Sequence, residues 1–484
     1  MKPISRRHAL TSLALAPALA ACQVAPGTGR DSLNFMSADE EAKLGREAHP
    51  QILREFGGAY DDPAAQAYLA GIGQRLARVT ETPAADFRFT VLNSDIVNAM
   101  ALPGGYVYVT RGLMTLADNE AELAGVIGHE LGHILARHSA QRYSRAMASN
   151  VVLGVLGIVI GQPGLSDLAN LGASYWLQSF SQDNEFEADS LGVRYLSRGG
   201  WHAEGMASFL DKLRDHSRLD AVMAGRSPDS VDEVHFMSTH PRTIDRVRAA
   251  MQASLGAPPQ GAFGADNLLD RVDGMMWGDD PAQGVVRKRA FLHPAGFRFE
   301  VPEGFRLVNG DKAVMARHAS GAAIIFDGAN WRGGTDMANY ISRVWLPRAQ
   351  LGNGESLDVN GMPAATATSR TRTKQGNLDV RVVAIRFDAD TVMRFTFLTP
   401  PGQTARLGAE LKQTTHSFRR LSAEERAAIR PLRIKVIRVK GGDSAESLAA
   451  RMALDEWAVE NFRLLNGLKP EEQPAVGKRV KLIV

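Results

Sequence analysis

Apolar residues recur at three- and four-residue spacing over most of residues 37–252, and this period predicts amphipathic helices. One stretch departs from it, because residues 87–91 alternate apolar and polar side chains as a half-buried strand does. Residues 98–102 and 106–110 predict two more strands, joined by a turn at Pro103-Gly104-Gly105. The first half of the chain is therefore expected to be mainly helical, with one small sheet.

The pattern changes after residues 255–281, a segment rich in proline and glycine that we interpret as a domain boundary. Strand-like stretches follow it, and a helix capped by Thr335 is expected over residues 336–346. This mixture predicts an α+β domain, and the last segment, residues 434–484, is short enough to be a separate module. The strand-like stretches are residues 297–301, 322–327, 380–387 and 392–398.

At 484 residues the chain is longer than one hydrophobic core usually serves, so a multidomain protein is expected. Its 56 basic and 53 acidic side chains nearly cancel and form no long basic block, so nucleic acid is not an expected partner. The expected parts are a signal peptide at 1–21, a tether at 22–36, a mainly α domain at 37–254, a linker at 255–290, an α+β accessory domain at 291–421 and a small module at 433–484.

The N-terminus predicts export, because basic residues precede an apolar stretch at residues 10–21 that is too short to span a bilayer. The sequence Leu19-Ala20-Ala21-Cys22 resembles a bacterial lipobox, in which the signal is cut before a cysteine that receives lipid. We therefore expect Cys22 to anchor the protein at the periplasmic face of the envelope, in the outer membrane rather than the inner. The alternative is a buried free thiol, and both Sec and twin-arginine export stay open.

An apolar run at residues 151–160 is the best candidate for membrane contact beyond the signal peptide. A bilayer-spanning helix needs about 20 apolar residues, and this run is only half as long. We interpret it as a buried helix or a helix-packing segment.

The motif Gly128-His129-Glu130-Leu131-Gly132-His133 carries the clearest chemistry in the chain. Histidines four residues apart lie on one face of a helix, so both imidazoles can bind one ion, and Glu130 projects toward a water bound to that ion. Such ligands predict zinc. The three glycines at positions 125, 128 and 132 disfavour a helix, which is explained if another backbone packs closely against it.

A catalytic zinc site needs a third protein ligand and an open position for water. We predict Glu185 as that ligand and Asp189, one helical turn later, as the acceptor of a hydrogen bond from a ligand imidazole. The alternative is a solvated acidic helix face. His138 falls about half a helical turn out of phase with His129 and is interpreted as a surface histidine, while Glu187 is expected to point elsewhere.

Together with residues 98–105 and 110–113, these sequences resemble metallopeptidase family forty-eight, the gluzincin group of the CAAX prenyl proteases, HtpX, BepA and LoiP. The resemblance covers residues 37–252 and implies a zincin-type domain that holds one Zn²⁺ per chain, with Glu130 activating the water. It also implies that the strand at residues 106–110 lines the cleft and that substrate binds as an added strand.

The resemblance extends to Thr239-His240-Pro241 and to Arg246. It implies that His240 acts as a switch ligand that caps the zinc in a latent form, and that Arg246 helps to stabilise the oxyanion. The alternative for His240 is simple packing at the start of a helix.

The C-terminal module resembles a divergent LysM domain, a β-α-α-β fold associated with peptidoglycan, through Gly442-Asp443 and Asn466-Gly467-Leu468. The middle α+β domain bears a faint resemblance to Mog/PsbP-like domains. LysM likeness implies contact with peptidoglycan in addition to membrane attachment through Cys22.

The function expected from the whole is that of a zinc-dependent endopeptidase of the bacterial cell envelope. Its substrates would be misfolded or unassembled envelope proteins, so that the enzyme serves quality control. The alternative is a latent or non-catalytic assembly factor or chaperone that binds outer-membrane proteins or peptidoglycan.

Overall fold

The computed structural model describes residues 22–29, 31–33, 36–144, 179–229, 231, 244–258, 260–310, 313–373 and 376–484. The chain divides into two compact units, of which the first comprises Met1–Trp277 with Arg433–Val484 and the second Gly278–Leu432. The predicted signal peptide, the apolar run at 151–160 and His240 lie outside the described residues. Within these ranges, no helix combines the length and the apolar character that crossing a membrane requires.

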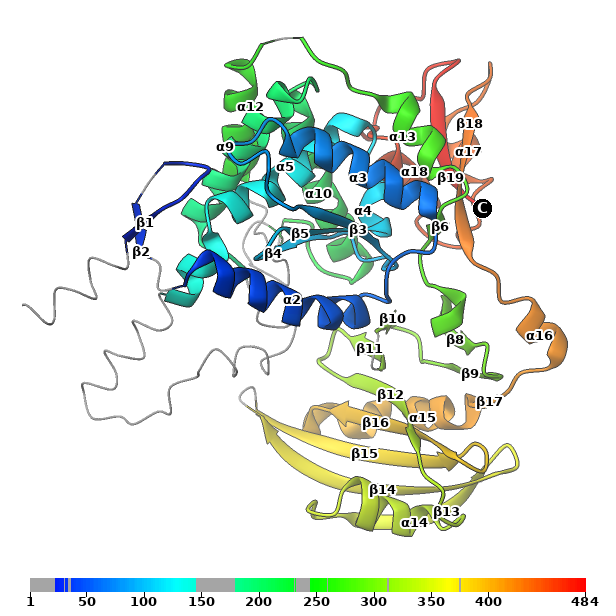
Figure 1. The fold of residues 1–484 in the computed structure, drawn as a ribbon. Coiled ribbons are helices and arrows are strands. Elements are labelled where there is room, and N and C mark those ends of the chain that lie inside the picture. The colour runs from blue at the N-terminus through cyan, green and yellow to red at the C-terminus, as the bar shows by residue number, and fades with distance from the viewer. Residues whose placement is uncertain are drawn as a thin grey trace, which may run out of the picture. The chain divides into compact units, whose positions relative to one another are not determined.

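The first unit is mainly helical, as the three- and four-residue period predicted (Figure 1). Helix α5 is its central element: nearly all of its residues are buried, and it packs against α9, α10 and α3. The helices before the C-terminal segment are α2 (Ala38–Glu55), α3 (Pro63–Ala77), α4 (Arg111–Leu116), α5 (Glu120–Leu135), α9 (Gln182–Arg198), α10 (Glu204–Met223), α12 (Ile244–Leu255) and α13 (Ala265–Val272).

The expected small sheet is present and precedes α5 in the chain. Its strands are β3 (Arg88–Leu92), β4 (Ala99–Leu102) and β5 (Tyr106–Thr110), and the turn between β4 and β5 uses positive φ angles at Gly104 and Gly105. Strand β5 lies in the centre, parallel to β3 and antiparallel to β4.

This strand order corrects one expectation. Strand β5 cannot accept an added substrate strand, because β3 and β4 already occupy its two edges. Among the described strands of this sheet, β4 has the unpaired edge on the side away from β3, and β4 also packs against α5.

The glycines of α5 allow close helix packing, as predicted. A Cβ at Gly128 would lie 3.2 Å from the Gly192 carbonyl oxygen of α9, and one at Gly132 would lie 3.1 Å from the Ala188 carbonyl oxygen. On another face of α5, a Cβ at Gly125 would lie 3.2 Å from the Cα of Met206 in α10. The helix that carries the histidine pair is therefore held against two neighbouring backbones.

The segment that follows Cys22 contacts the end of α5. Strands β1 (Cys22–Val24) and β2 (Asp31–Leu33) pair with each other, and the backbone N–H of Gly27 donates to the Leu135 carbonyl oxygen at 3.0 Å. Arg194 of α9 donates to the Gly27 carbonyl oxygen at 2.7 Å.

The C-terminal segment has the predicted β-α-α-β order. It consists of β18 (Leu432–Arg438), α17 (Ala445–Ala449), α18 (Ala458–Leu465) and β19 (Arg479–Ile483). Strand β18 pairs with β19 and also with β6 (Met276–Trp277), which precedes the second unit in the chain. This segment therefore belongs to the same compact unit as the helical domain, although the sequence suggested a separate module.

A buried lysine links the C-terminal segment to the helical domain. The Lys481 ammonium, on β19, is 1% exposed and donates to the carbonyl oxygens of Thr115, Leu116 and Ala117 at the end of α4. A cation is favoured at a helix C-terminus, where carbonyl groups lack partners within the helix. Helix α5 begins only a few residues later, at Glu120.

The second unit is an α+β domain, as expected. Its large antiparallel sheet has the strand order β10-β11-β12-β16-β15-β14-β13, and a smaller one has the order β17-β9-β8-β7. The strands are β7 (Val285–Arg287), β8 (Ala290–His293), β9 (Phe297–Glu300), β10 (Phe305–Asn309), β11 (Val314–His318), β12 (Ala323–Asn330), β13 (Gly352–Val359), β14 (Met362–Thr373), β15 (Gly376–Arg386), β16 (Thr391–Thr399) and β17 (Arg419–Arg420).

Helices cover both faces of the large sheet. Helix α15 (Pro401–Ser417) covers one face, where Phe326 and Phe395 of the strands meet Phe418, the residue that follows the helix. On the other face lie α14 (Met337–Asn339) and a π-helix, η2 (Tyr340–Trp345), where a single helix was predicted. The remaining elements are η1 (Pro281–Gln283) and α16 (Ala423–Ala427).

Candidate metal centre

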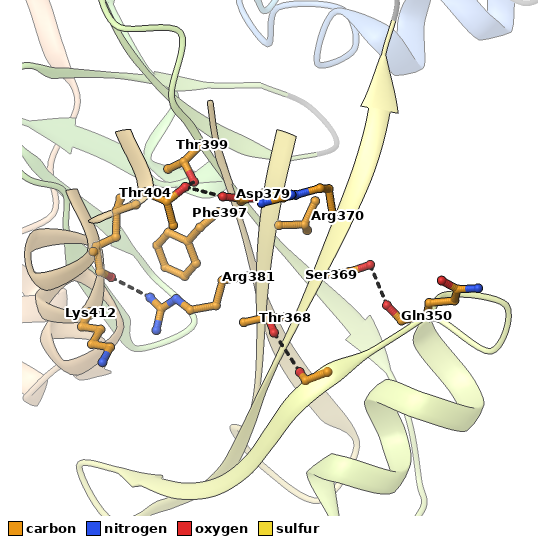
Figure 2. Close-up of a pocket in the computed structure, with 14 residues that line it drawn as sticks. Gln350, Thr368, Ser369, Arg370, Asp379, Arg381, Phe397, Thr399, Thr404 and Lys412 are labelled. Atoms are coloured by element: carbon orange, nitrogen blue, oxygen red, sulfur yellow. Dashed lines mark hydrogen bonds and ion pairs between the residues drawn. The ribbon is translucent and has the colours of Figure 1, made fainter. Parts of the chain in front are cut away.

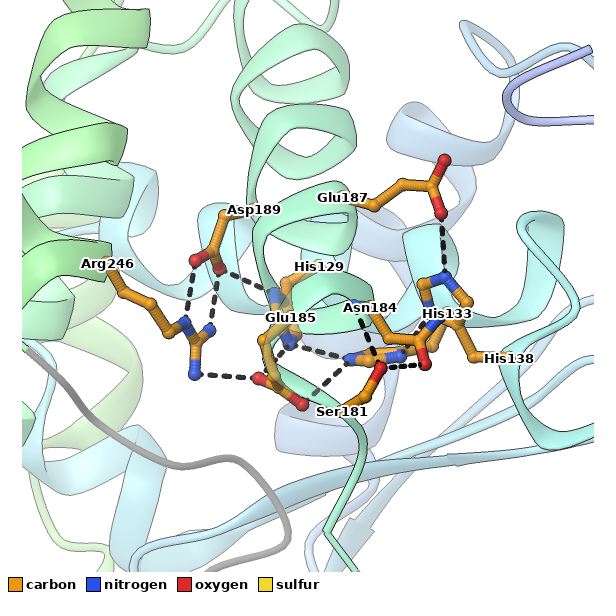
Figure 3. A network of polar contacts seen from close by, with 9 residues as sticks. All are labelled: His129, His133, His138, Ser181, Asn184, Glu185, Glu187, Asp189 and Arg246. Carbon is orange, nitrogen blue, oxygen red and sulfur yellow. Dashed lines mark hydrogen bonds and ion pairs between the residues drawn. The ribbon is translucent and has the colours of Figure 1, made fainter. Parts of the chain in front are cut away.

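Two helices bring the three predicted ligands together. Helix α5 places His129 and His133 one turn apart, and the first turn of α9 places Glu185 beside them (Figure 3). Each imidazole Nε2 lies 3.6 Å from a carboxylate oxygen of Glu185, and the two Nε2 atoms are 3.0 Å apart. The ligand atoms all lie within 4.8 Å of one another, and the three side chains are buried.

This donor set fits zinc. Two imidazole nitrogens and one carboxylate oxygen are the protein ligands of one type of catalytic zinc site, which keeps a fourth position for water. Convergence of these groups in the interior is costly without a cation to bind them. In the described part of the chain, no other group of three or more His, Cys, Asp or Glu side chains converges in this way.

The start of α9 determines where Glu185 lies. Ser181 is the N-cap, and its hydroxyl accepts a hydrogen bond from the backbone N–H of Asn184. Glu185 thus falls in the first turn, where the helix dipole favours a carboxylate. Asp189 follows one turn later on the same face, as predicted from the spacing.

Asp189 and Arg246 form hydrogen bonds with the predicted ligands and hold them in position. The Asp189 Oδ1 atom lies 2.8 Å from His129 Nδ1, so this imidazole can donate its N–H to the carboxylate and turn Nε2 toward a metal. Arg246, on α12, donates to both Asp189 oxygens at 2.7 Å and to Glu185 Oε2 at 2.7 Å. One guanidinium therefore holds both a predicted ligand and the carboxylate that orients another.

The electrostatics of this network keep Asp189 ionised. Burial by itself would raise the pKa of Asp189, but the charge of Arg246 and the hydrogen bonds from Arg246 and His129 outweigh it and lower the pKa to about 2. An ionised Asp189 accepts the His129 N–H over the whole physiological pH range.

Arg246 is itself buried and is directed at these two carboxylates rather than away from them. The role in oxyanion stabilisation that the family resemblance implied stays a prediction, whereas the contacts show a residue that positions Glu185 and Asp189. Burial would lower the pKa of Arg246, but Asp189, Glu185 and Glu130 together raise it. Glu130, also buried, therefore lies close enough for its charge to act on Arg246.

His138 corrects a prediction. It is fully buried, although the sequence suggested a surface histidine. Its Nδ1 lies 2.8 Å from His133 Nδ1, and its Nε2 lies 3.1 Å from Glu187 Oε2. Glu187 lies outside the group of three predicted ligands. It contacts His138, which in turn contacts the predicted ligand His133.

The reason for this error is a break in the helix. The phase of His138 was predicted for a helix continuing past His133, but α5 ends at Leu135 and Arg137 adopts a positive φ of 57°. This turn directs His138 back toward α5. Burial is the largest influence on its pKa and lowers it despite the nearby Glu187, which favours a neutral imidazole.

Comparison with known proteins finds a family model and several relatives that match part of the chain. Residues 63–254 match peptidase family M48. The beta-barrel assembly-enhancing protease of Yersinia pestis is 31% identical over 274 residues, which cover 54% of this chain and 54% of the relative. Metalloprotease LoiP of Escherichia coli (strain K12) is 33% identical over 156 residues, covering 31% of this chain and 56% of its own length.

A eukaryotic relative also matches part of the chain. The mitochondrial metalloendopeptidase OMA1 of Schizosaccharomyces pombe is 27% identical over 231 residues, or 46% of this chain and 64% of its own length. The chain thus spans about half the length of the beta-barrel assembly-enhancing proteases it matches.

Solved structures resemble the chain only distantly. Cyanobacterial PsbP from Synechocystis sp. PCC 6803 matches 30% of the chain with 15% identity and a TM-score of 0.23. The Ran-binding protein Mog1p of Saccharomyces cerevisiae matches 28% with 13% identity and a TM-score of 0.20. These scores are too low to support an argument about function.

Proposed function

We propose that this chain, whose residues 63–254 match peptidase family M48, is a zinc-dependent endopeptidase of the bacterial cell envelope. The observation that carries the proposal is the convergence of His129, His133 and Glu185, with Asp189 and Arg246 behind them. Side chains that only stabilised the fold would not need two imidazoles and a carboxylate in the ligand arrangement of a hydrolytic zinc site.

The chemistry follows from the arrangement of the chain's own residues. Zinc, when bound by His129, His133 and Glu185, would lower the pKa of a water and polarise the scissile carbonyl. Glu130 would act as the general base, which accepts a proton from the attacking water and passes it to the leaving amine. Asp189 holds the His129 ring, and Arg246 holds the carboxylates of Asp189 and Glu185.

The substrates we propose are misfolded or unassembled envelope proteins, which makes the enzyme a quality-control protease. Two observations support this class. Relatives are named beta-barrel assembly-enhancing proteases, and the edge of β4, which pairs with no further strand among the described residues, offers backbone groups to an extended chain. Unfolded β-rich chains present such extended segments, which bind by adding a strand.

We further propose that Cys22 is lipidated and anchors the enzyme at the periplasmic face of the outer membrane. The lipobox-like sequence supports this, and so does the position of the next residues at the end of α5, since Gly27 contacts Leu135. An anchor placed there would hold the peptidase domain close to the membrane. The β-α-α-β order of the C-terminal segment supports, more weakly, contact with peptidoglycan.

Glu130→Gln tests the proposed chemistry most cleanly. The variant should bind one zinc per chain and unfold at the same temperature as the wild type. Its cleavage of casein should fall at least about 100-fold, the lower range for loss of a general base. Glu47→Gln, at an exposed position of α2, is the matched control and should cleave normally. An unchanged rate in Glu130→Gln would reject the proposed mechanism.

A further inference from the structure

A pocket in the second unit has no part in the proposed proteolysis. It lies beside α15 and is lined by side chains of β14, β15, β16 and that helix (Figure 2). Its volume is about 490 Å³. Pockets of about 300 to 1,000 Å³ commonly hold small-molecule ligands.

A guanidinium without an acidic partner lies at the wall of this pocket. Arg381, on β15, stacks over the Phe397 ring at 4.3 Å and donates to the Leu411 carbonyl oxygen at 2.9 Å and to Thr415 Oγ1 at 3.0 Å. Among the described residues, no carboxylate lies within ion-pair distance of Arg381, and burial lowers its pKa to about 10. A cation held in this way is costly to bury unless an anion is bound beside it.

The acidic side chain of the pocket is already neutralised. Asp379 accepts a hydrogen bond from Arg370 Nε at 2.7 Å and another from Thr404 Oγ1 at 2.7 Å. These bonds, that of Arg370 first, lower the pKa of Asp379 below its ordinary value. Lys412 adds a second cation at the exposed rim, so the lining keeps an excess of positive charge.

A glycine in the middle of α15 keeps the pocket open. Gly408 lines the pocket, and glycine in a helix interior costs about 1 kcal/mol relative to alanine. Packing among the described residues does not require a glycine at position 408, because a Cβ there would meet no atom within 4 Å. This differs from Gly128 and Gly132 of α5, where neighbouring backbones occupy that space. Any larger side chain at Gly408 would instead enter the pocket.

We propose that this pocket binds a small amphiphilic anion, a molecule with one phosphate or carboxylate group and an apolar body. The anionic group pairs with Arg381 and Lys412, and the apolar body contacts Phe397 and Leu411. This site is independent of the metal centre and of the proposed proteolysis.

Calorimetric titration of the full chain with octyl phosphate tests the proposal. Gly408→Leu should fill the pocket and weaken binding at least about tenfold, because a Leu side chain displaces the apolar body of the ligand. Leucine favours a helix more than glycine does, so the fold should be retained, as circular dichroism would show. Gly402→Leu is the matched control, since Gly402 lies in the same helix outside the pocket with open space around it, and it should bind normally.

A second pair of variants tests the charge. Arg381→Met should lose at least about tenfold in affinity, as expected for a charge-assisted hydrogen bond, whereas Arg317→Met, at an exposed position of β11, should lose none. Unchanged binding in Gly408→Leu would overturn the proposal. So would equal affinity for octanol, which lacks the charge, or for inorganic phosphate, which lacks the apolar body.

Vesicles distinguish the two sources of such an anion. Flotation of the chain with phosphatidylglycerol vesicles, lost in Gly408→Leu but not in Gly402→Leu, would identify a membrane lipid. Binding of octyl phosphate without such flotation would identify a soluble metabolite. Failure of both to bind would overturn the proposal, without bearing on casein cleavage by the metal centre.

Discussion

The side chains around His129 form a connected network of hydrogen bonds and ion pairs, in which one side chain holds the next in position. Asp189 orients the His129 ring, and Arg246 bridges Asp189 to Glu185. All four side chains are buried. Removing one of them leaves the polar or charged group of its partner unpaired in the protein interior, where an unpaired group is energetically costly. The ligand geometry therefore depends on residues that would not themselves touch the metal.

Asp189→Ala tests this dependence. The variant should bind zinc about 10- to 100-fold more weakly, because His129 loses the acceptor that fixes its tautomer and ring orientation. The measurement is a competition titration with a chromophoric chelator. Asp183→Ala, an exposed aspartate in the first turn of the same helix, is the control and should bind zinc as the wild type does. Equal zinc affinity in Asp189→Ala and Asp183→Ala would contradict the assigned role.

Local sequence was sufficient to predict the grouping of His129, His133 and Glu185, because each depends on helical spacing and helices α5 and α9 are regular there. It was insufficient for His138. The chain direction after α5 depends on a positive φ at Arg137, which pairs with Glu41 of α2. A contact between residues so distant in the chain leaves no periodic signal in either segment.

Among the secondary-structure elements, close packing of α5 on α9 joins the two halves of the candidate metal centre. Glycines on both helices make that approach possible, and a Cβ at Gly192 would lie only 3.1 Å from the backbone nitrogen of His129. The sequence predicted the close approach from the unfavourable glycines but not the identity of the partner helix. Strand order was likewise unpredictable, since β5 pairs with β3 across an intervening strand.

Gly132→Leu should separate these helices. The new side chain would meet the backbone of Ala188, which cannot move aside as a flexible side chain can, so Glu185 should shift away from the histidines. We expect a loss of zinc affinity of at least about tenfold and a destabilisation of about 1–3 kcal/mol, typical of overpacking. Gly71→Leu, in α3 with open space around it, is the control. Zinc binding unchanged in Gly132→Leu would show that the close contact is not needed.

At the scale of the whole molecule, the C-terminal segment is part of the unit that holds the metal centre. The sequence predicted its β-α-α-β order from local patterns. Its attachment was not predictable, because a lysine in a strand ordinarily faces solvent and Lys481 instead lies buried against the end of α4. The pairing of β18 with β6 joins chain segments on either side of the entire second unit.

The pH dependence of stability reports on this buried lysine. Burial lowers the pKa of Lys481 to about 7, although Asp118, whose Oδ1 lies 3.5 Å from the Lys481 Nζ, opposes this shift. Above this value the unfolded chain therefore binds a proton that the folded chain does not. The free energy of unfolding should therefore rise with pH from about 7 to 10.

Lys481→Met should remove the contribution of Lys481 to the rise of the unfolding free energy with pH. Urea unfolding followed by tryptophan fluorescence at pH 7, 8 and 9 would show this. Lys478→Met, at an exposed position, should keep the wild-type slope. A slope in Lys481→Met equal to that of the wild type would mean that Lys481 is not buried as described.

Anomalous diffraction at the zinc edge, from crystals of the full chain, would show whether two distant segments of the chain bind one zinc ion. We expect one peak per chain, at about 2.0–2.2 Å from His129 Nε2, His133 Nε2 and a Glu185 carboxylate oxygen. A zinc peak bound by the histidines with Glu185 turned away, or no peak in this cluster from zinc-loaded crystals, would contradict this expectation.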